Sequence, residues 1–142
     1  MTYRELKKKQ QDEINAFPLM FAFNKGQFAD GMRKLGLDPD DTAQIQSIGG
    51  GGYVRKTDYA ALENLLNSHA AELREAIAAD PTGDGFIYDM FYTELADHEY
   101  IISGDLAPAL AALNLSVDDV NGSETLLHGL RKATEAQSKI DY

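Results

Sequence analysis

Four consecutive glycines, Gly49 to Gly52, constrain the fold of this 142-residue chain more than any other feature. Glycine is unfavourable inside helices and strands, and it readily adopts the left-handed conformations of tight turns. The run is therefore a turn. The flanking segments 44–48 and 53–56 have the composition of short strands, which predicts an antiparallel hairpin. We therefore expect the chain to contain a sheet.

Most of the remaining chain has helical periodicity. The clearest helix is capped by Thr57 or Asp58 and continues to about Ala79, with apolar residues at three- and four-residue spacings. Further strands are predicted at 19–23, which we expect to be buried, and at 98–102. We expect an α+β fold with five or six helices around a small, mostly antiparallel sheet of three or four strands. At 15.6 kDa, one domain over residues 1–142 is expected.

One pattern occurs twice, at an offset of 78 residues. The segment 28–41 aligns with 106–119, and in each copy a helix is followed by a residue suited to a left-handed helix end, Gly36 and Asn114. Shared architecture and a common way of ending a helix are both open as explanations.

Negative charge is concentrated in one part of the sequence. The formal net charge is −10, no Lys or Arg occurs between Arg74 and Arg131, and residues 75–130 contain eleven acids. Such a segment repels nucleic-acid phosphate and anionic lipid and attracts basic protein surfaces. It is interpreted either as a solubilising face or as a docking surface for a basic groove, including one that normally holds DNA.

The docking interpretation assigns partner binding to acids that the turn, helix and strand at 80–102 gather together. These are Asp84, Asp89, Glu94, Asp97 and Glu99. Asp118 and Asp119 form a second group, for which capping a helical turn is the alternative role.

The segment 80–87, Asp-Pro-Thr-Gly-Asp-Gly-Phe-Ile, is similar to the first eight positions of an EF-hand calcium loop. Acids occupy positions one and five, and glycine occupies position six. However, the third position is Thr82, and the twelfth, which should supply a bidentate Glu, is Phe91. We expect a capped turn without metal, and the alternative is a calcium site at Asp80 and Asp84.

The sequence offers no catalytic residue. It contains no cysteine, and no serine lies in a nucleophile elbow. His69 lies on the apolar face of the long helix and is expected in the core. The glycine run, with Arg55 and Lys56 after it, is an alternative anion site, although it lacks the Walker pattern. We expect a protein that is not an enzyme and needs no cofactor.

Four strings of the sequence are similar to those of a known family. They are FPLMFAFNKGQFADGMRKLGL (17–37), SIGGGGYVRKTD (47–58), TGDGFIYDMFYTELADHEY (82–100) and LLHGLRKA (126–133). The chain resembles a family of small uncharacterised proteins of phages and mobile elements in gut Firmicutes. The resemblance carries no assigned activity. It implies a context in which short accessory proteins often inhibit host defences, including CRISPR nucleases.

The leading hypothesis is a non-enzymatic inhibitor of a host defence nuclease, most specifically an anti-CRISPR protein. Its acidic segment 75–130 would occupy a DNA-binding channel, with no direct contact to nucleic acid or membrane. The longest apolar run, 17–23, contains Pro18 and is too short to cross a bilayer, and no signal peptide is visible, so we expect the host cytoplasm.

Two other classes of function stay open. One is a small-ligand or calcium-binding module that uses the 80–85 turn or the 49–52 glycine hairpin. The other is a structural or regulatory protein that oligomerises through the apolar segment 17–23.

Overall fold

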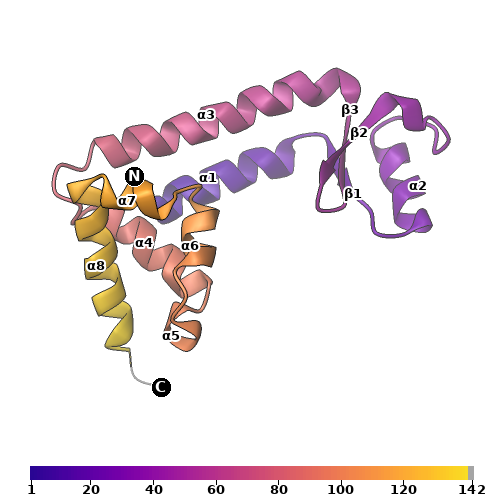
Figure 1. The fold of residues 1–142 in the computed structure, drawn as a ribbon. Coiled ribbons are helices and arrows are strands. Elements are labelled where there is room, and N and C mark those ends of the chain that lie inside the picture. Colours follow the sequence, from indigo (N-terminus) through magenta and orange to yellow (C-terminus); the bar gives the residue numbers. More distant parts are fainter. Residues whose placement is uncertain (141–142) are drawn as a thin grey trace. The chain divides into compact units, whose positions relative to one another are not determined.

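The computed structural model describes residues 1–140 and has an α+β fold, as expected (Figure 1). Within these residues, one three-stranded antiparallel sheet accompanies five helices of ten residues or more and three shorter ones. The elements are α1 (Tyr3–Ala16), β1 (Leu19–Phe21), α2 (Lys25–Lys34), β2 (Ile45–Gly49), β3 (Gly52–Arg55), α3 (Tyr59–Ala78), α4 (Phe86–Asp97), α5 (Tyr100–Ser103), α6 (Ala107–Ala112), α7 (Val117–Asn121) and α8 (Glu124–Ser138). Short 3₁₀ turns at Thr42–Gln44 and Lys56–Asp58 precede β2 and α3.

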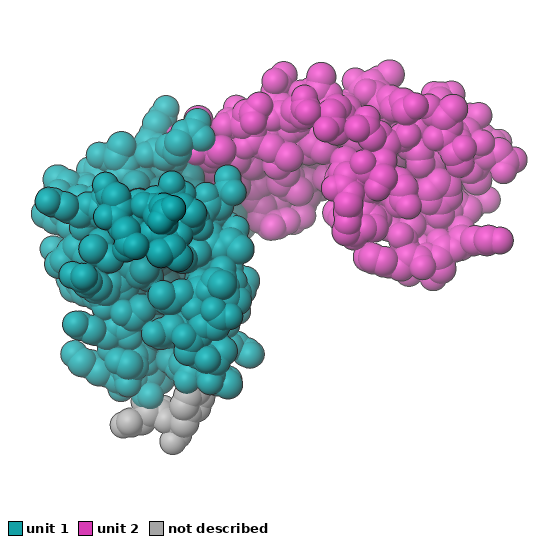
Figure 2. All heavy atoms as spheres, viewed as in Figure 1, with its two compact units in different colours: residues 1–8, 72–142 teal, residues 9–71 magenta. Residues whose placement is uncertain are grey.

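The chain forms two compact units (Figure 2). We call residues 9–71 the sheet unit, and residues 1–8 together with 72–142 the helical unit. That the two belong to a single domain stays a prediction.

The sheet unit contains the predicted hairpin and one further strand. The strand order is β1-β3-β2, both pairs are antiparallel, and Leu19 pairs with Val54 and Phe21 with Gly52. The strands predicted at 19–23, 44–48 and 53–56 are thus confirmed, with small differences at their ends. Helix α2 packs closely on β1, since a Cβ on Gly31 would lie only 2.5 Å from Sδ of Met20.

The glycine run makes the turn between β2 and β3. Gly49, Gly50 and Gly51 have φ angles of 87°, 60° and 79°. Side chains larger than hydrogen are strained at these angles, which is the physical reason for glycine at each position.

Helix α4 forms the centre of the helical unit. Ile87, Met90, Phe91 and Leu95 are fully buried on it and pack with residues of α6, α7 and α8. Helix α8 approaches closely at Gly129, where an added Cβ would lie 2.5 Å from Cγ2 of Ile87. Within the described residues, no strand contributes to this core.

The strand predicted at 98–102 is wrong. Helix α4 ends at Asp97, Glu99 adopts a left-handed conformation with φ of 55°, and the chain then enters the short helix α5. Half-buried Tyr100 packs against the helical core. Packing of this kind outweighs the weak strand preference of a short apolar segment.

The two helix ends related by the 78-residue offset have the same geometry. Gly36 and Asn114 have φ angles of 77° and 55°. The N–H of Leu37 donates to the carbonyl of Met32 at 2.9 Å, and that of Leu115 donates to Leu110 at 3.0 Å. Both ends are therefore Schellman caps, one in each unit.

Candidate functional site

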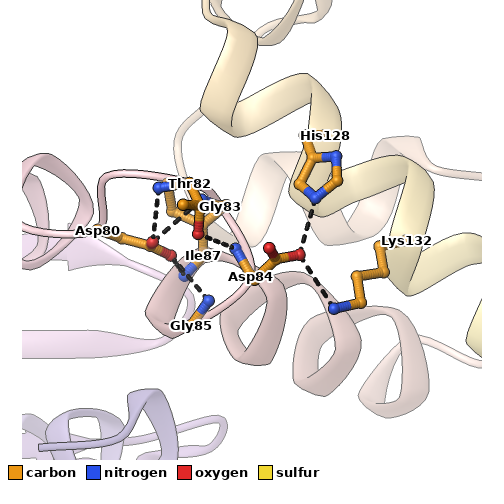
Figure 3. A network of polar contacts seen from close by, with 8 residues as sticks. All are labelled: Asp80, Thr82, Gly83, Asp84, Gly85, Ile87, His128 and Lys132. Atoms are coloured by element: carbon orange, nitrogen blue, oxygen red, sulfur yellow. Dashed lines mark hydrogen bonds and ion pairs between the residues drawn. The ribbon is translucent and has the colours of Figure 1, made fainter.

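The loop before α4 is organised by the buried carboxylate of Asp80. Its Oδ1 accepts hydrogen bonds from the N–H groups of Thr82 and Gly83, at 3.2 and 3.0 Å. Its Oδ2 accepts from Gly85 and Ile87, at 3.1 and 3.0 Å (Figure 3). Burial alone would raise the pKa of Asp80, but these four donors outweigh it and lower the pKa. The ionised carboxylate thus fixes the start of α4.

Asp84 joins this loop to α8. Its Oδ1 lies 2.7 Å from Nε2 of His128 and 3.0 Å from Nζ of Lys132 (Figure 3). These two hydrogen bonds lower the pKa of Asp84. The Lys132 ammonium also lies 5.2 Å from the centroid of the Tyr88 ring. The predicted partner-binding residue Asp84 is therefore already bonded to two side chains of its own unit.

These contacts favour the capped turn over the calcium loop. Asp80 directs both oxygens at backbone donors, whereas a calcium ligand directs them at the ion. Asp84 faces two side chains of α8, and Phe91 at the twelfth position is fully buried. A calcium ion at Asp80 would have to compete with these four backbone donors for both carboxylate oxygens.

Glu94 is buried and holds the first turns of α1. Only 1% of its surface is exposed. Its Oε1 accepts hydrogen bonds from Oη of Tyr3 at 2.5 Å and from Nζ of Lys7 at 2.7 Å, and its Oε2 lies 3.3 Å from Nε2 of His98. The prediction that Glu94 binds a partner is corrected, because the side chain is inaccessible.

The same contacts shift the pKa values of the two α1 residues. Burial, and then the hydrogen bond to Glu94, raise the pKa of the Tyr3 hydroxyl. Burial alone would lower the pKa of Lys7, but its bonds to Glu94 and Asp97 outweigh this effect and raise it. Both groups therefore keep their protons at neutral pH, as the contact requires.

Asp89 and Asp97 of α4 also contact the first turns of α1. Oδ2 of Asp89 accepts the N–H of Tyr3 at 2.9 Å, which satisfies a free donor at the start of α1. Oδ2 of Asp97 lies 3.3 Å from Nζ of Lys7. Asp97 is exposed and Asp89 is half-buried. The three acids thus tie α1 to α4.

Asp119 forms a capping box at the start of α7. Its side chain accepts the N–H of Ser116 at 2.8 Å, and its own N–H donates to Oγ of Ser116 at 3.0 Å. These bonds lower the pKa of Asp119. The capping role is therefore confirmed for Asp119. Asp118 and Glu99, the two other predicted residues, are exposed.

The structure therefore leaves a smaller acidic surface than the sequence predicts. In the segment 75–130, the acids that are exposed and make no side-chain hydrogen bond or ion pair within the described residues are Glu75, Glu99, Asp118 and Glu124. We call these four residues the exposed acids.

His69 on α3 is buried, as expected, and its Nε2 faces Oε1 of Glu13 at 3.3 Å. The side-chain amide of Gln10 donates to the His69 carbonyl at 3.0 Å. These contacts join α1 and α3 within the sheet unit.

The glycine hairpin contacts apolar side chains of its own unit. A Cβ on Gly51 would lie 2.5 Å from the Phe23 ring, and one on Gly52 would lie 3.0 Å from both Phe21 and Ile48. Arg55, which the anion interpretation requires, instead donates to Asp58 at 2.7 Å and to the Leu35 carbonyl at 3.1 Å. Packing thus favours glycine at Gly51 and Gly52, whereas Gly49 and Gly50 have open space around them and are explained by their φ angles alone.

The expectation of a buried strand at 19–23 is only half right. Met20 and Ala22 are buried, whereas Phe21 and Phe23 are 58% and 77% exposed. Side chains of a strand alternate between two faces, and glycine opposite Phe21 provides no side chain to cover it. The exposure of Phe21 and Phe23 could have been predicted from the sequence, because strand side chains alternate between two faces and the glycine run lies in the neighbouring strand.

A family model matches residues 2–136, and the chain belongs to that family, which is described as a family of unknown function (DUF7659). Comparisons with curated proteins and with solved structures gave no match. No helix in residues 1–140 is both long and apolar enough to span a membrane.

Proposed function

We propose that this protein is a non-enzymatic inhibitor that binds the basic, DNA-binding channel of a host defence nuclease, most specifically a CRISPR effector. The observation that carries the proposal is the separation of charge between the units. The helical unit has fifteen acidic and seven basic residues, whereas the sheet unit has eight and six. A field of this sign attracts a surface that evolved to hold DNA phosphate.

The exposed acids make the contact. Their carboxylates are not used by the fold, so a partner meets them without breaking internal bonds. Complementary charge mainly accelerates association, and added salt weakens it. The same field disfavours direct binding of nucleic acid and of anionic membranes.

The proposal includes a biological context. It places the protein among accessory proteins of phages or mobile elements, acting in the cytoplasm of a bacterial host. The support for this context is the similarity of the four strings at 17–37, 47–58, 82–100 and 126–133.

Competition against DNA tests the function directly. Purified CRISPR effector–guide RNA complexes of several types would be mixed with the protein, and loading of labelled target DNA would be followed by fluorescence anisotropy. We expect inhibition that weakens as salt increases. Absence of both inhibition and complex formation on size exclusion, with every effector tested, would reject the proposal.

A matched pair of charge reversals tests the surface. We expect Glu99→Lys with Asp118→Lys, in the helical unit, to abolish inhibition without lowering the Tm, since exposed charges contribute little to stability. The control is Asp40→Lys with Asp41→Lys in the sheet unit, which makes the same change in net charge on exposed residues. Equal loss in both variants would indicate net charge rather than a docking surface.

Binding of a small ligand is the second candidate function. An open surface pocket of about 580 Å³ in the sheet unit is lined by Phe23, Phe28 and Tyr53, and its polar lining residues are Asn24, Lys25 and Asp40. Volumes of this size are typical of ligand sites. Calorimetry with nucleotides, calcium and magnesium would separate the candidates, because a pure docking protein gives no heat with any of them.

A further inference from the structure

Three side chains of α1 and α3 bring potential metal ligands together. They are Glu13 of α1 and His69 and Glu72 of α3, and one ligand atom from each lies within 4.8 Å of the other two. Among residues 1–140, no other group of three or more His, Asp or Glu side chains has this spacing. The function proposed above uses none of the three.

The His69 ring is buried, yet its Nε2 atom makes no hydrogen bond. The side chain is only 10% exposed, and Nε2 lies 3.3 Å from Oε1 of Glu13. In the part of the chain that the structure describes, both atoms are buried and neither has a hydrogen-bond partner. Buried polar atoms in native proteins are nearly always satisfied, so this pair requires an explanation, and a bound ion supplies one.

The 3.3 Å separation suits two ligands of one tetrahedral zinc ion. Bonds from zinc to a His nitrogen or a Glu oxygen are about 2.0–2.2 Å long, which places two tetrahedral ligands about 3.4 Å apart. The only other contact printed for Oε1 of Glu13 is an ion pair with Nζ of Lys9 at 3.5 Å. Both side chains of that pair are partly exposed, so giving it up costs little.

Helix geometry brings Glu72 to the same place. Glu72 follows His69 by three positions on α3, and residues at this spacing share one face of a helix. The boundary between the two units falls just before Glu72, inside this continuous helix. The spacing of His69 and Glu72 is therefore set by α3 itself.

A hydrogen bond holds the two helices together at the level of these ligands. Gln10 lies one turn before Glu13 on α1, and its side-chain amide donates to the carbonyl of His69 at 3.0 Å. The contact places the Glu13 and His69 side chains opposite each other without help from an ion. Ligands held in position in this way lower the cost of binding.

We propose that Glu13, His69 and Glu72 bind one divalent transition-metal ion of the zinc type, with water at the fourth position. The imidazole nitrogen favours such an ion over calcium and magnesium, which prefer oxygen ligands throughout. Two carboxylates balance the charge of the ion. The bound ion links α1 to α3 and stabilises the protein.

Isothermal titration calorimetry with zinc chloride and the untagged full-length protein tests the site. We expect one zinc ion per chain, which calcium and magnesium do not displace. Loss of an outer partner of a metal ligand already weakens binding about tenfold to a hundredfold, so His69→Gln, which removes a ligand, should raise the Kd at least about a hundredfold. Glu13→Gln and Glu72→Gln should each weaken binding as well.

His128 provides the matched control. It forms a histidine–carboxylate pair with Asp84 at 2.7 Å, but on the surface of the helical unit, where its side chain is 52% exposed. His128→Gln therefore removes an equally plausible surface ligand, and we expect the zinc affinity to stay unchanged. A loss equal to that of His69→Gln would mean an adventitious ion only.

Thermal unfolding separates metal binding from folding. Because His69 is buried, circular dichroism first verifies that each variant is folded, and Glu72→Gln tests the site at a half-buried position. A ligand that binds only the folded state raises its stability. Zinc should therefore raise the Tm of the wild type and of His128→Gln, raise that of Glu72→Gln less, and lose its effect when a chelator is added.

Three results would overturn the proposal. They are no zinc binding by the wild type, an unchanged affinity in all three ligand variants, and equal loss in the His128 control. None of them bears on inhibition of a nuclease, which depends on the exposed acids.

Discussion

The helical unit buries charged residues, whereas the sheet unit exposes large apolar ones. In the helical unit, acids such as Asp80 and Glu94 are buried and hydrogen-bonded. In the sheet unit, Phe21 and Phe23 are exposed beside a glycine turn. Residue type alone predicts the reverse. The comparison teaches that a carboxylate becomes interior when several donors converge on it, and that a phenylalanine stays outside when no side chain faces it.

Among the substitutions that test this comparison, Glu94→Ala should reduce the unfolding free energy most. It removes the acceptor of Tyr3 and the partner of Lys7 and leaves a buried hydroxyl unpaired, so we expect a loss of about 4 kcal/mol in unfolding free energy. Urea denaturation measures it, and hydrogen exchange should show the loss in residues 72–140 rather than in the sheet unit. Glu99→Ala, at an exposed acid, is the control. Similar values for the two variants would show that burial of Glu94 contributes nothing.

Asp80→Ala should cost about 3 kcal/mol, because four backbone donors lose a charged acceptor at once. Asp118→Ala is the exposed control, with little expected change. A loss below that of an ordinary surface substitution would contradict the capping role.

Asp80 should also make the stability of the protein depend on pH. The pKa of Asp80 is lowered in the folded state, so the unfolded chain binds its proton first as the pH falls. Its stabilisation is present above about pH 4, the unfolded pKa, and is lost as the pH drops through the lower folded value. Urea denaturation between neutral and strongly acidic pH should therefore show a smaller acid slope in Asp80→Ala than in the wild type.

Gly51→Ala tests the sheet unit and should cost about 2 kcal/mol. The substitution combines a left-handed φ with a clash against the Phe23 ring. Gly50→Ala has a similar φ but open space around it, and should cost about 1 kcal/mol. Thermal unfolding measures both. In a Phe23→Ala background the two costs should become equal, and a persisting difference would exclude the ring contact as its cause.

Asp84→Ala should have the smallest effect, below about 0.5 kcal/mol, because its partners His128 and Lys132 are half-exposed and water screens the pair. Denaturation at low and high salt would measure it. A loss as large as that expected for Asp80→Ala would mean that paired acids on the surface of the helical unit also stabilise the fold.

Local features of the chain were predictable from its sequence. The glycine turn, the Schellman caps at Gly36 and Asn114 and the capped turn at Asp80 each depend on residues a few positions apart. Short-range sterics and hydrogen bonding decide them. The strand at 98–102 was wrong because Glu99 turns the chain and Tyr100 packs on distant helices.

The candidate site was predictable in its charge but not in its accessible residues. Five of the seven predicted partner-binding acids make a side-chain hydrogen bond or ion pair. Among the described residues, only Glu99 and Asp118 of these seven make none. Four of these contacts are with residues far along the chain, at Tyr3, Lys7 or α8, which no local pattern reveals.

The sequence by itself determined the helices other than α5, the hairpin, the helix ends and the confinement of negative charge to one segment, because periodicity, backbone sterics and composition act over short distances. Only the tertiary structure decided which acids and which phenylalanines are exposed. Glu94 is buried because Tyr3, 91 positions away, brings a hydroxyl to it. Phe21 is exposed because the strand register places it opposite Gly52. Exposure depends on which distant residues meet, and packing of the whole chain sets that.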